Sequence, residues 1–346
     1  MTAKTTLKEI AERTGVSVST VSRIINSPDD TFARKPIRDK VWEIVRETGY
    51  TPNQSARALK RSTESPAKKP LTVTCILGRT RNFEDNPFFA QVARSVEQQA
   101  LSMGCSVSKP YSVLDVSERL LLKEAGSVKA DGAIVLGRFK AGMRNFFENH
   151  YKNIVYVGRN VIDADWDQVV CDGYEAGKTA LRYLMELGHR RIGYIGETKD
   201  EVRYRAYADA VKECGLDDDR ALVASFPQDS AGGYRGAGYL LRASVPRPTA
   251  VFCATDISAV AAIKRFSEAG IRIPEQLSVI GMDDIEIAQY VTPMLTTVNI
   301  PKVELGKVAL HTLLDRINGV HRLPIKIFLP HKLLIRESTA KPKVSE

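Results

Sequence analysis

The side chains best suited to recognition chemistry lie on a short expected helix near the N-terminus. Val21, Ile24 and Ile25 fall on one face of residues 18–26, which is therefore the expected buried face. The opposite face carries Val18, Ser19, Ser22 and Arg23. An arginine guanidinium can bond two acceptors on guanine, a serine hydroxyl can bond either kind of base edge, and a valine can pack on a thymine methyl. This pattern is typical of a helix that reads DNA in the major groove.

Two further helices are expected to hold this reading helix in place. Thr6 and Glu9 form a capping box at the start of the first helix, and Gly15 suits the left-handed turn that follows it. The third helix is expected over residues 35–48, with an inner stripe of Val41, Trp42 and Val45. The alternative is a small helical bundle whose polar face is merely solvated.

The distribution of charge favours the DNA reader over that alternative. Residues 1–70 hold 14 Lys and Arg against 8 Asp and Glu, a net charge of +6, whereas the other 276 residues supply only +3 of the chain's +9. Binding to DNA phosphates requires such a concentration of positive charge. Residues 50–62 are basic with few apolar side chains, so they are expected to fold only with a partner, and residues 63–70 are an expected linker.

Composition argues against several other classes of protein. Of the 346 residues 43% are hydrophobic, enough for two or three domains, yet no run approaches the ~20 apolar residues of a membrane span. The first residues contain no apolar signal core, which favours a cytoplasmic protein. The five cysteines form no close pair and are expected to be buried free thiols. The five histidines have no metal-ligand spacing, so neither a metal nor a cofactor is expected.

From residue 71 onward, short apolar strands alternate with helices, a pattern typical of parallel sheets covered on both faces. Strands are expected at residues 71–77, 105–109, 132–136, 154–157, 169–171, 192–195, 221–225, 250–253 and 277–280. Helices are expected at residues 88–103, 174–187, 203–214, 232–242, 256–269 and 302–318. These are too many units for one sheet, so we expect two α/β lobes, with a ligand cleft beyond the carboxyl ends of their strands. The expected lobes are residues 71–166 with 297–326, and residues 167–296 with 327–340.

The chain resembles the LacI/GalR family of transcriptional regulators over nearly its whole length. The segments that carry the resemblance are LKEIA (7–11), GVS (15–17), TVSR (20–23), YTPN (50–53), NPFF (86–89), DG (131–132), LGHRRI (187–192), IP (273–274), LSVIGMDD (277–284) and PMLTTV (293–298). This ordered set is far more specific than a helix-turn-helix alone. The resemblance implies an all-α helix-turn-helix DNA-binding domain over residues 1–49, a hinge helix over residues 50–62, and a two-lobed α/β effector domain like a periplasmic binding protein.

The resemblance also implies how the protein meets DNA. It implies a homodimer whose two reader domains occupy the half-sites of a near-palindromic operator. In the hinge, Leu59 matches the leucine that wedges into the minor groove, where the cost of unstacking is offset by added contacts on bent DNA. Ser17 and Arg34 match phosphate contacts, and either could equally be a helix cap. The full set of expected DNA contacts is Leu7, Ser17, Val18, Ser19, Thr20, Ser22, Arg23, Asn26, Arg34, Asn53, Ala56, Leu59 and Lys60.

The family's effector site, by the same resemblance, is assembled from both lobes. Asp283 would accept hydrogen bonds from sugar hydroxyls, Arg203 would donate, and a phenylalanine would cover the apolar face of the sugar ring. The structural alternatives for these residues are a helix cap, an ion pair and a core aromatic. The full set of expected effector contacts is Phe88, Phe89, Arg138, Arg203, Phe226, Thr255 and Asp283.

Some positions depart from the usual pattern of the family. Gly158-Arg159 stands where many members have an Asp-Arg pair, and Gln228 stands near the usual stacking aromatic of the second lobe. The chain resembles the branch of the family around the evolved-β-galactosidase repressor at three places: Thr255, Gly137-Arg138-Phe139 and residues 328–333. A galactoside is therefore the expected effector.

These observations together predict a repressor of carbohydrate-utilisation genes that a sugar releases from its operator. A co-repressor-dependent regulator of the same family and a free sugar-binding protein are the alternatives. No G-x-G-x-x-G, G-x-x-x-x-G-K-[ST] or G-x-S-x-G motif is present, and no enzyme is expected. The tail, residues 341–346, lacks leucine heptads, which favours a dimer over a tetramer.

Overall fold

A computed structural model describes residues 6–26, 33–48, 50, 70–79, 83, 86–114, 130–140, 142–243 and 245–343. The chain divides into two compact units, Met1–Lys69 and Pro70–Glu346, which are considered separately below. The expected hinge contacts Asn53, Ala56, Leu59 and Lys60 lie outside the described residues. Within the described ranges, no helix combines the length and the apolarity that crossing a bilayer requires.

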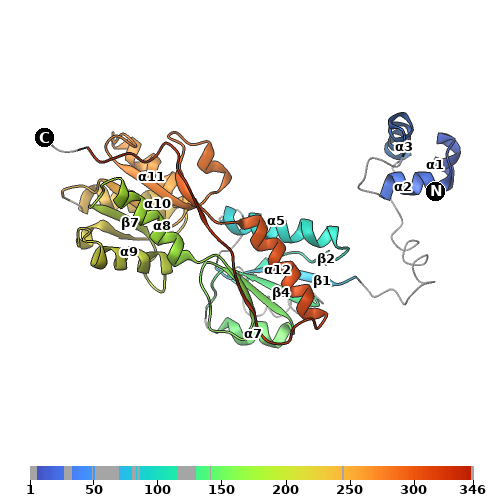
Figure 1. The fold of residues 1–346 in the computed structure, drawn as a ribbon, viewed down its shortest axis with the longest axis horizontal. Helices are drawn as coiled ribbons and strands as arrows, with labels where there is room; N and C mark the ends of the chain where they lie inside the picture. The colour runs from blue at the N-terminus through green and yellow to red at the C-terminus, as the bar shows by residue number, and fades with distance from the viewer. Residues whose placement is uncertain are drawn as a thin grey trace. The chain divides into compact units, whose positions relative to one another are not determined.

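The first unit is a bundle of three helices, α1 (Leu7–Thr14), α2 (Val18–Asn26) and α3 (Lys35–Thr48) (Figure 1). The expected cap of α1 is confirmed, because the Thr6 hydroxyl accepts from the N–H of Glu9 at 3.3 Å. Gly15 ends α1 at φ +74°, a conformation that favours glycine. The core consists of Ile10, Ala11, Val21, Ile24, Val41 and Ile44.

The prediction that Trp42 belongs to the inner stripe of α3 is wrong. Trp42 is 39% exposed, whereas Ile44 is buried with Val41. Positions three apart share a helical face, so Val41 brings Ile44 inward and turns Trp42 outward. The expected bounds of α3, residues 35–48, are confirmed.

The second unit begins with a largely parallel sheet in the order β12-β6-β5-β4-β1-β2, with β3 also paired to β1. Its strands are β1 (Thr72–Leu77), β2 (Ser106–Val107), β3 (Tyr111–Ser112), β4 (Gly132–Leu136), β5 (Ile154–Gly158), β6 (Asp167–Val170) and β12 (Lys326–Phe328). Two helices that pack together, α5 (Pro87–Ser102) and α12 (Lys302–Ile317), cover one face (Figure 1). On the other face, Phe147 of α7 (Met143–His150) packs with Val135 and Tyr156.

A second sheet has the order β13-β11-β10-β9-β7-β8, with only β13 antiparallel. Its strands are β7 (Ile192–Gly196), β8 (Val223–Ser225), β9 (Ala250–Cys253), β10 (Ser278–Asp283), β11 (Thr296–Asn299) and β13 (Lys332–Leu334). Helices α8 (Gly173–Glu186) and α9 (Val202–Glu213) form one packed pair, and α10 (Ser230–Ala243) and α11 (Asp256–Glu268) form the other. Two short 3-10 helices, η1 (Arg220–Leu222) and η2 (Glu286–Gln289), complete this half.

The two-lobed architecture is as expected, but the assignment to lobes is wrong at three strands: β6, β11 and β12, the last of which pairs with β6 of the first sheet although residues 327–340 were assigned to the second lobe. We expected residues 167–171 to open the second lobe, yet β6 pairs in parallel with β5 of the first sheet. Conversely, β11 pairs with β10 of the second sheet, although residues 297–299 were assigned to the first lobe. A short apolar strand has the same pattern in either sheet, so only its pairing partner decides to which lobe it belongs.

The cysteines are unpaired, as expected, but not all of them are buried. Cys75, Cys171 and Cys253 lie in the core, Cys105 is half-buried and Cys214 is exposed. Burial raises the pKa of the Cys75 and Cys171 thiols to about 12, which keeps both neutral and unreactive.

Candidate functional site

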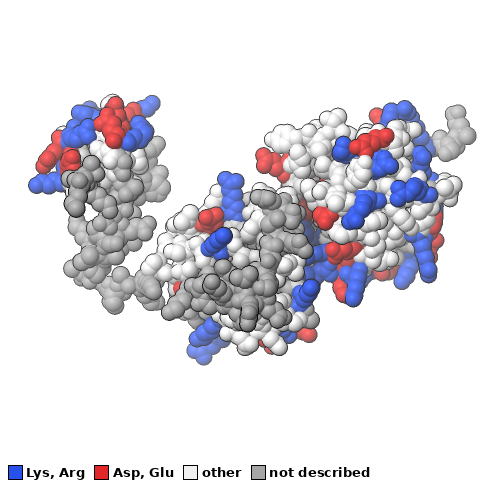
Figure 2. Space-filling model, turned by 180° about the vertical axis from the view of Figure 1, so that it is seen from behind, with Lys and Arg blue, Asp and Glu red and all other residues white. Residues whose placement is uncertain are grey.

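The outward face of α2 is the candidate surface for DNA. Val18 is 44% exposed, and Ser19 and Arg23 are exposed beside it, while Ser22 is half-buried. Lys and Arg side chains are interspersed with Asp and Glu on the described part of this unit (Figure 2). The face therefore offers the donors and the small apolar side chain that were expected for base contacts.

Of the two residues for which a cap was the alternative role, Ser17 caps α2 through its hydroxyl, whereas Arg34 contributes only its backbone carbonyl at the start of α3. The N–H of Thr20 donates to the Ser17 hydroxyl at 3.1 Å, and the two hydroxyls lie 2.8 Å apart. The backbone carbonyl of Arg34 accepts from the N–H of Ile37 at 2.9 Å. Arg34 itself is exposed. Leu7 is half-buried against the bundle core. These roles leave the Ser17 hydroxyl and the Arg34 side chain at the surface.

The second unit contains a cavity of about 530 Å³ at the carboxyl ends of strands from both sheets. Its lining comprises Arg79, Asn86, Phe89, Leu114, Arg159, Glu197, Pro227, Gln228, Asp229, Ser230, Ala231, Thr255 and Ile257. A small adjoining recess is lined by Arg79, Phe89, Gly137, Arg138, Tyr156, Arg159, Asn160, Glu201, Val202 and Arg203. This is the place where open parallel sheets bind ligands.

Three neighbouring strands of the first sheet place an arginine at this cavity. The strands β1, β4 and β5 are adjacent, and each is completed by a Gly-Arg pair, namely Gly78-Arg79, Gly137-Arg138 and Gly158-Arg159. Gly137 has φ +79°, and a Cβ built there would lie 2.7 Å from the Phe89 ring. Close packing of the strand ends thus requires glycine at this position and directs the next side chain into the cavity.

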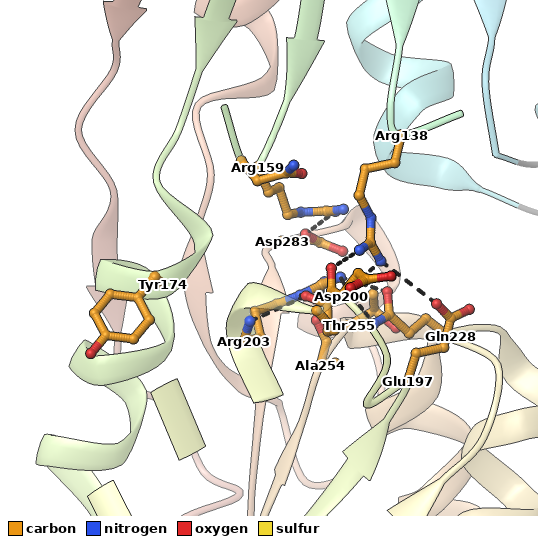
Figure 3. Close-up of polar contacts among 12 residues, drawn as sticks. Arg138, Arg159, Tyr174, Glu197, Asp200, Arg203, Gln228, Ala254, Thr255 and Asp283 are labelled. Atoms are coloured by element: carbon orange, nitrogen blue, oxygen red, sulfur yellow. Dashed lines mark hydrogen bonds and ion pairs between the residues drawn. The ribbon is translucent and has the colours of Figure 1, made fainter. Parts of the chain in front are cut away.

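The second lobe contributes the carboxylates that pair with these arginines. Glu197 follows β7, Glu201 caps the start of α9, and Asp283 ends β10. Figure 3 shows Arg159 reaching toward Asp283 and Arg138 reaching toward Glu197 from the first lobe. Arg79 pairs with Glu197, and Arg159 pairs with Asp283. Ion pairs that cross between the lobes therefore line the cavity.

Glu201 is the group on which most of these contacts converge. It receives a forked pair of bonds from Arg203 at 2.7 and 2.9 Å, and Arg138 donates to it at 3.0 Å. Gln228 donates at 2.9 Å, and the guanidinium of Arg79 lies at 3.6 Å. Burial alone would raise the pKa of Glu201, but the three guanidiniums outweigh burial and hold that pKa well below its usual range.

Arg159 is placed between an aromatic ring and a carboxylate. Its guanidinium carbon lies 3.9 Å from the centroid of Phe88, and its Nη2 donates to Asp283. The side chain is only 9% exposed, and its Nε finds no hydrogen-bond partner in the described structure. Burial lowers the pKa of Arg159 despite the neighbouring Asp283 carboxylate. One donor of this buried guanidinium is thus enclosed by protein without a partner in the described structure.

A second buried acid, Asp256, is hydrogen-bonded to residues that adjoin the end of β10. Asp256, the first residue of α11, accepts from the Thr297 hydroxyl at 2.6 Å and from the N–H of Ile285 at 3.0 Å. Burial, together with the Asp283 carboxylate, raises the pKa of Asp256 to about 7. The ammonium of Lys302 donates to the backbone carbonyls of Asp283 and Asp284. In the described residues no cluster of His, Cys, Asp and Glu could hold a metal ion.

Most of the expected effector residues meet at this cavity, although two play other roles. Phe89 and Thr255 line the main cavity, Arg138 and Arg203 line the recess, and Asp283 is engaged by Arg159. The ring of Phe88 is covered by Arg159 and lies in neither lining. Phe226 lies in neither lining; its ring centroid is 6.4 Å from that of Tyr239 on α10, and its expected contact with the ligand stays a prediction.

Sequence reasoning missed several residues that line the cavity. Arg79, Glu197 and Glu201 were not singled out, and Arg159 and Gln228 were noted only as departures from the family pattern. The missed signal was the Gly-Arg pair that recurs at the end of three strand candidates. Each pair alone is ordinary, and only the adjacency of the strands makes the three arginines converge.

A three-helix unit with an exposed polar helix and a two-lobed unit with an inter-lobe cavity define a class, that of ligand-responsive DNA-binding regulators. Family models agree with this division. Residues 6–53 match the model of bacterial regulatory proteins of the lacI family, and residues 181–339 match a periplasmic binding protein-like domain.

Relatives match over nearly the entire chain. The HTH-type transcriptional repressor PurR of Erwinia tasmaniensis is 32% identical over 351 residues, covering 97% of both chains. The ribose operon repressor of Haemophilus influenzae is 33% identical over 353 residues, covering 96% of this chain and 98% of its own. The chain belongs to the LacI family, and it is a DNA-binding transcriptional regulator with an effector-binding domain.

Solved structures agree with this assignment. A complex of the transcriptional regulator CelR with cellobiose has a TM-score of 0.69 and 28% identity, covering 96% of this chain and 99% of its own. A lac repressor dimer bound to operator and the anti-inducer ONPF also has a TM-score of 0.69, over 98% of this chain and all of its own, but at 20% identity. The latter likeness concerns the fold alone.

Proposed function

We propose that this protein is a homodimeric repressor that binds a near-palindromic operator through α2 and that changes its affinity for DNA when a small molecule enters the inter-lobe cavity. The observation that carries the proposal is the exposed outward face of α2, with Arg23 and the small side chains of Val18 and Ser19. A helix entering the major groove presents such side chains to base edges. No catalytic step is part of the proposal.

The effector acts, in this proposal, through its different affinities for two arrangements of the lobes. A ligand that binds one arrangement better shifts the population toward it, and the coupling to DNA must be reciprocal. A sugar inducer was expected from the sequence, and the names of the ribose operon repressor and of the CelR–cellobiose complex are in keeping with a sugar. A co-repressor-dependent regulator, the alternative that the sequence left open, is the second candidate. Neither name supports a galactoside in particular.

The direct test is a fluorescence-anisotropy titration of the full-length protein onto a palindromic operator from upstream of its own gene, at fixed salt. Arg23→Ala should abolish the preference for one base pair in each half-site, a loss of about 1–3 kcal/mol each. The matched control is Arg13→Ala. Arg13 belongs to α1, not to the outward face of α2, and its guanidinium pairs with the Glu47 carboxylate at 2.7 Å. Unchanged base preference in Arg23→Ala would refute the assignment of α2.

The hinge provides a second test. Leu59→Ala should weaken specific binding far more than non-specific binding, because a wedge acts only where the DNA is bent. Equal losses on specific and random DNA would reject the wedge. Adding candidate effectors to the same titration distinguishes the two modes of regulation, since an inducer weakens operator binding and a co-repressor strengthens it.

A further inference from the structure

We propose that the ligand of the inter-lobe cavity carries an anionic group, a carboxylate or a phosphate, which binds to Arg79, Arg138 and Arg159. This inference rests on the proposed function, in which the cavity is the effector site. It departs from the neutral galactoside that the sequence led us to expect.

The first argument is the charge of the first lobe's rim, by which we mean the residues that this lobe contributes to the linings of the cavity and the adjoining recess. Its described contributions to the two linings are Arg79, Asn86, Phe89, Leu114, Gly137, Arg138, Tyr156, Arg159 and Asn160; among these described residues are three guanidiniums and no acid. In the part of the chain that the structure describes, the carboxylates paired with these guanidiniums come from the second lobe. A neutral sugar needs acceptors as well as donors, whereas a rim of arginines matches an acceptor with negative charge.

The second argument is the state of Arg159. Its Nε is buried without a partner, and Asp283 takes up only Nη2. A guanidinium presents five N–H donors in a planar fork that suits a two-oxygen acceptor. The ring face of Phe88, one of the two phenylalanines expected to contact the effector, is already covered by this guanidinium. A cation thus occupies one face of Phe88, while Phe89 still lines the cavity.

The third argument identifies which contact the anion replaces. Glu201 is fixed by Arg203 and Gln228, and Asp229 caps α10 through the N–H of Gly232 at 2.6 Å. Glu197, in contrast, is 38% exposed and pairs with Arg79 and, at 3.7 Å, with Arg138. We therefore expect the anion to displace the Glu197 carboxylate from Arg79 and Arg138, while the buried Glu201 pairs persist.

The first arm of the test titrates orthophosphate into the full-length protein at constant ionic strength, with chloride as the reference, and follows binding by thermal shift and calorimetry. We expect saturable stabilisation of the wild type. Arg79→Gln should weaken phosphate binding about 10- to 100-fold, the value of one charged hydrogen bond. Glu197→Gln should tighten it severalfold, since a competing carboxylate is removed. The loss of Arg79 leaves no buried carboxylate without a partner, because Glu201 keeps its bonds from Arg203 and Arg138 and Glu197 is partly exposed.

The control for charge is Arg220→Gln, the same substitution at an exposed arginine of η1, which should bind phosphate like the wild type. A second arm compares galactose with galacturonate and galactose 6-phosphate, which share a body and differ in charge. Binding of galacturonate or of galactose 6-phosphate supports the proposal and identifies a carboxylate or a phosphate as the preferred anion.

Two results would overturn the proposal. The first is that the wild type does not bind phosphate, or that Arg79→Gln binds it equally tightly. The second is that galactose binds tightly and neither galacturonate nor galactose 6-phosphate binds more tightly than galactose. Operator binding is measured on the same preparations by anisotropy, without ligand. Failure there would remove the proposed function, whereas failure of anion binding alone would leave the DNA-binding role intact.

Discussion

The two lobes of the effector-binding unit share an architecture but end their strands in opposite charges. In the first lobe, β1, β4 and β5 lead into Arg79, Arg138 and Arg159. In the second lobe, β7 leads into Glu197 and β10 ends at Asp283. The same parallel-sheet edge therefore serves as a donor rim on one side and as an acceptor rim on the other. The contrast teaches that ion pairs cross between the lobes at the cavity, beside apolar side chains such as Phe89 and Leu114.

The acceptor rim is itself uneven, because its carboxylates differ in burial and in the number of their partners. Glu201 is buried and bonded by several groups, whereas Glu197 is partly exposed. Buried ion pairs are costly to break and exposed ones contribute little. The predictions below test this gradient, beginning with the most buried group.

The largest effect is expected for Glu201→Gln. Removing this charge leaves Arg203, which is 2% exposed, without its carboxylate, and such a loss typically costs ~3–5 kcal/mol. The free energy of unfolding from urea denaturation measures it, and Glu213→Gln on the exposed end of the same helix is the control. A loss under ~1 kcal/mol would contradict the role of Glu201 as the centre of the cluster. Because the pKa of Glu201 is lowered, its contribution should also disappear as pH falls below the usual range of a glutamate.

A second effect is expected from Asp256, on the acceptor side. Its pKa is raised from 3.8 to about 7 in the folded protein, so its contribution to stability is present below pH 4 and is lost as pH rises through 7. In Asp256→Asn the amide oxygen can still accept from the N–H of Ile285, and the amide NH2 can donate to Thr297. The stability of the wild type relative to this variant should therefore fall by ~3 kcal/mol between pH 5 and pH 8. Parallel stability curves for the two proteins would show that Asp256 is ionised throughout.

A third prediction concerns the pair formed by Arg159 and Asp283 across the lobes. A double-mutant cycle with Arg159→Met and Asp283→Asn should give a coupling energy of ~1–3 kcal/mol, because each single substitution leaves a buried partner unpaired. The same cycle at Lys178 and Glu175, an exposed pair 3.3 Å apart, should give less than ~0.5 kcal/mol. Equal coupling in the two cycles would remove the distinction between buried and surface pairs.

The reader unit could be predicted from the sequence almost residue by residue. Its cap at Thr6, its turn at Gly15 and the face of α2 depend on local spacing, which a sequence displays directly. The exception is Trp42, where an apolar residue was assigned inward although the helical spacing favoured Ile44. Local periodicity, rather than residue type, was the better guide.

The cavity could be predicted only in part, because its composition depends on which strands are neighbours. The strands themselves were largely expected, yet β6 was placed in the wrong lobe. Arg203 and Asp283 were expected from a family resemblance. Arg79 and Glu201 become visible as site residues only when β1 lies beside β4 and the two lobes face each other. Contacts between residues more than a hundred positions apart leave no trace in local spacing.

The smallest effect is expected for Glu197→Gln, and it sharpens the contrast with Glu201. Glu197 is partly exposed, so the variant should lose no more than ~1 kcal/mol of stability, and that loss should shrink as salt rises toward 1 M, where the Debye length is ~3 Å. The Glu201→Gln loss should persist in the same salt series, because a buried pair is screened much less. Denaturation of both variants at two salt concentrations measures the difference. If both losses vanished together, the rim would be a uniform, solvent-screened surface. If only the Glu197 loss vanished, the acceptor rim would contain one fixed carboxylate and one that a ligand anion can displace.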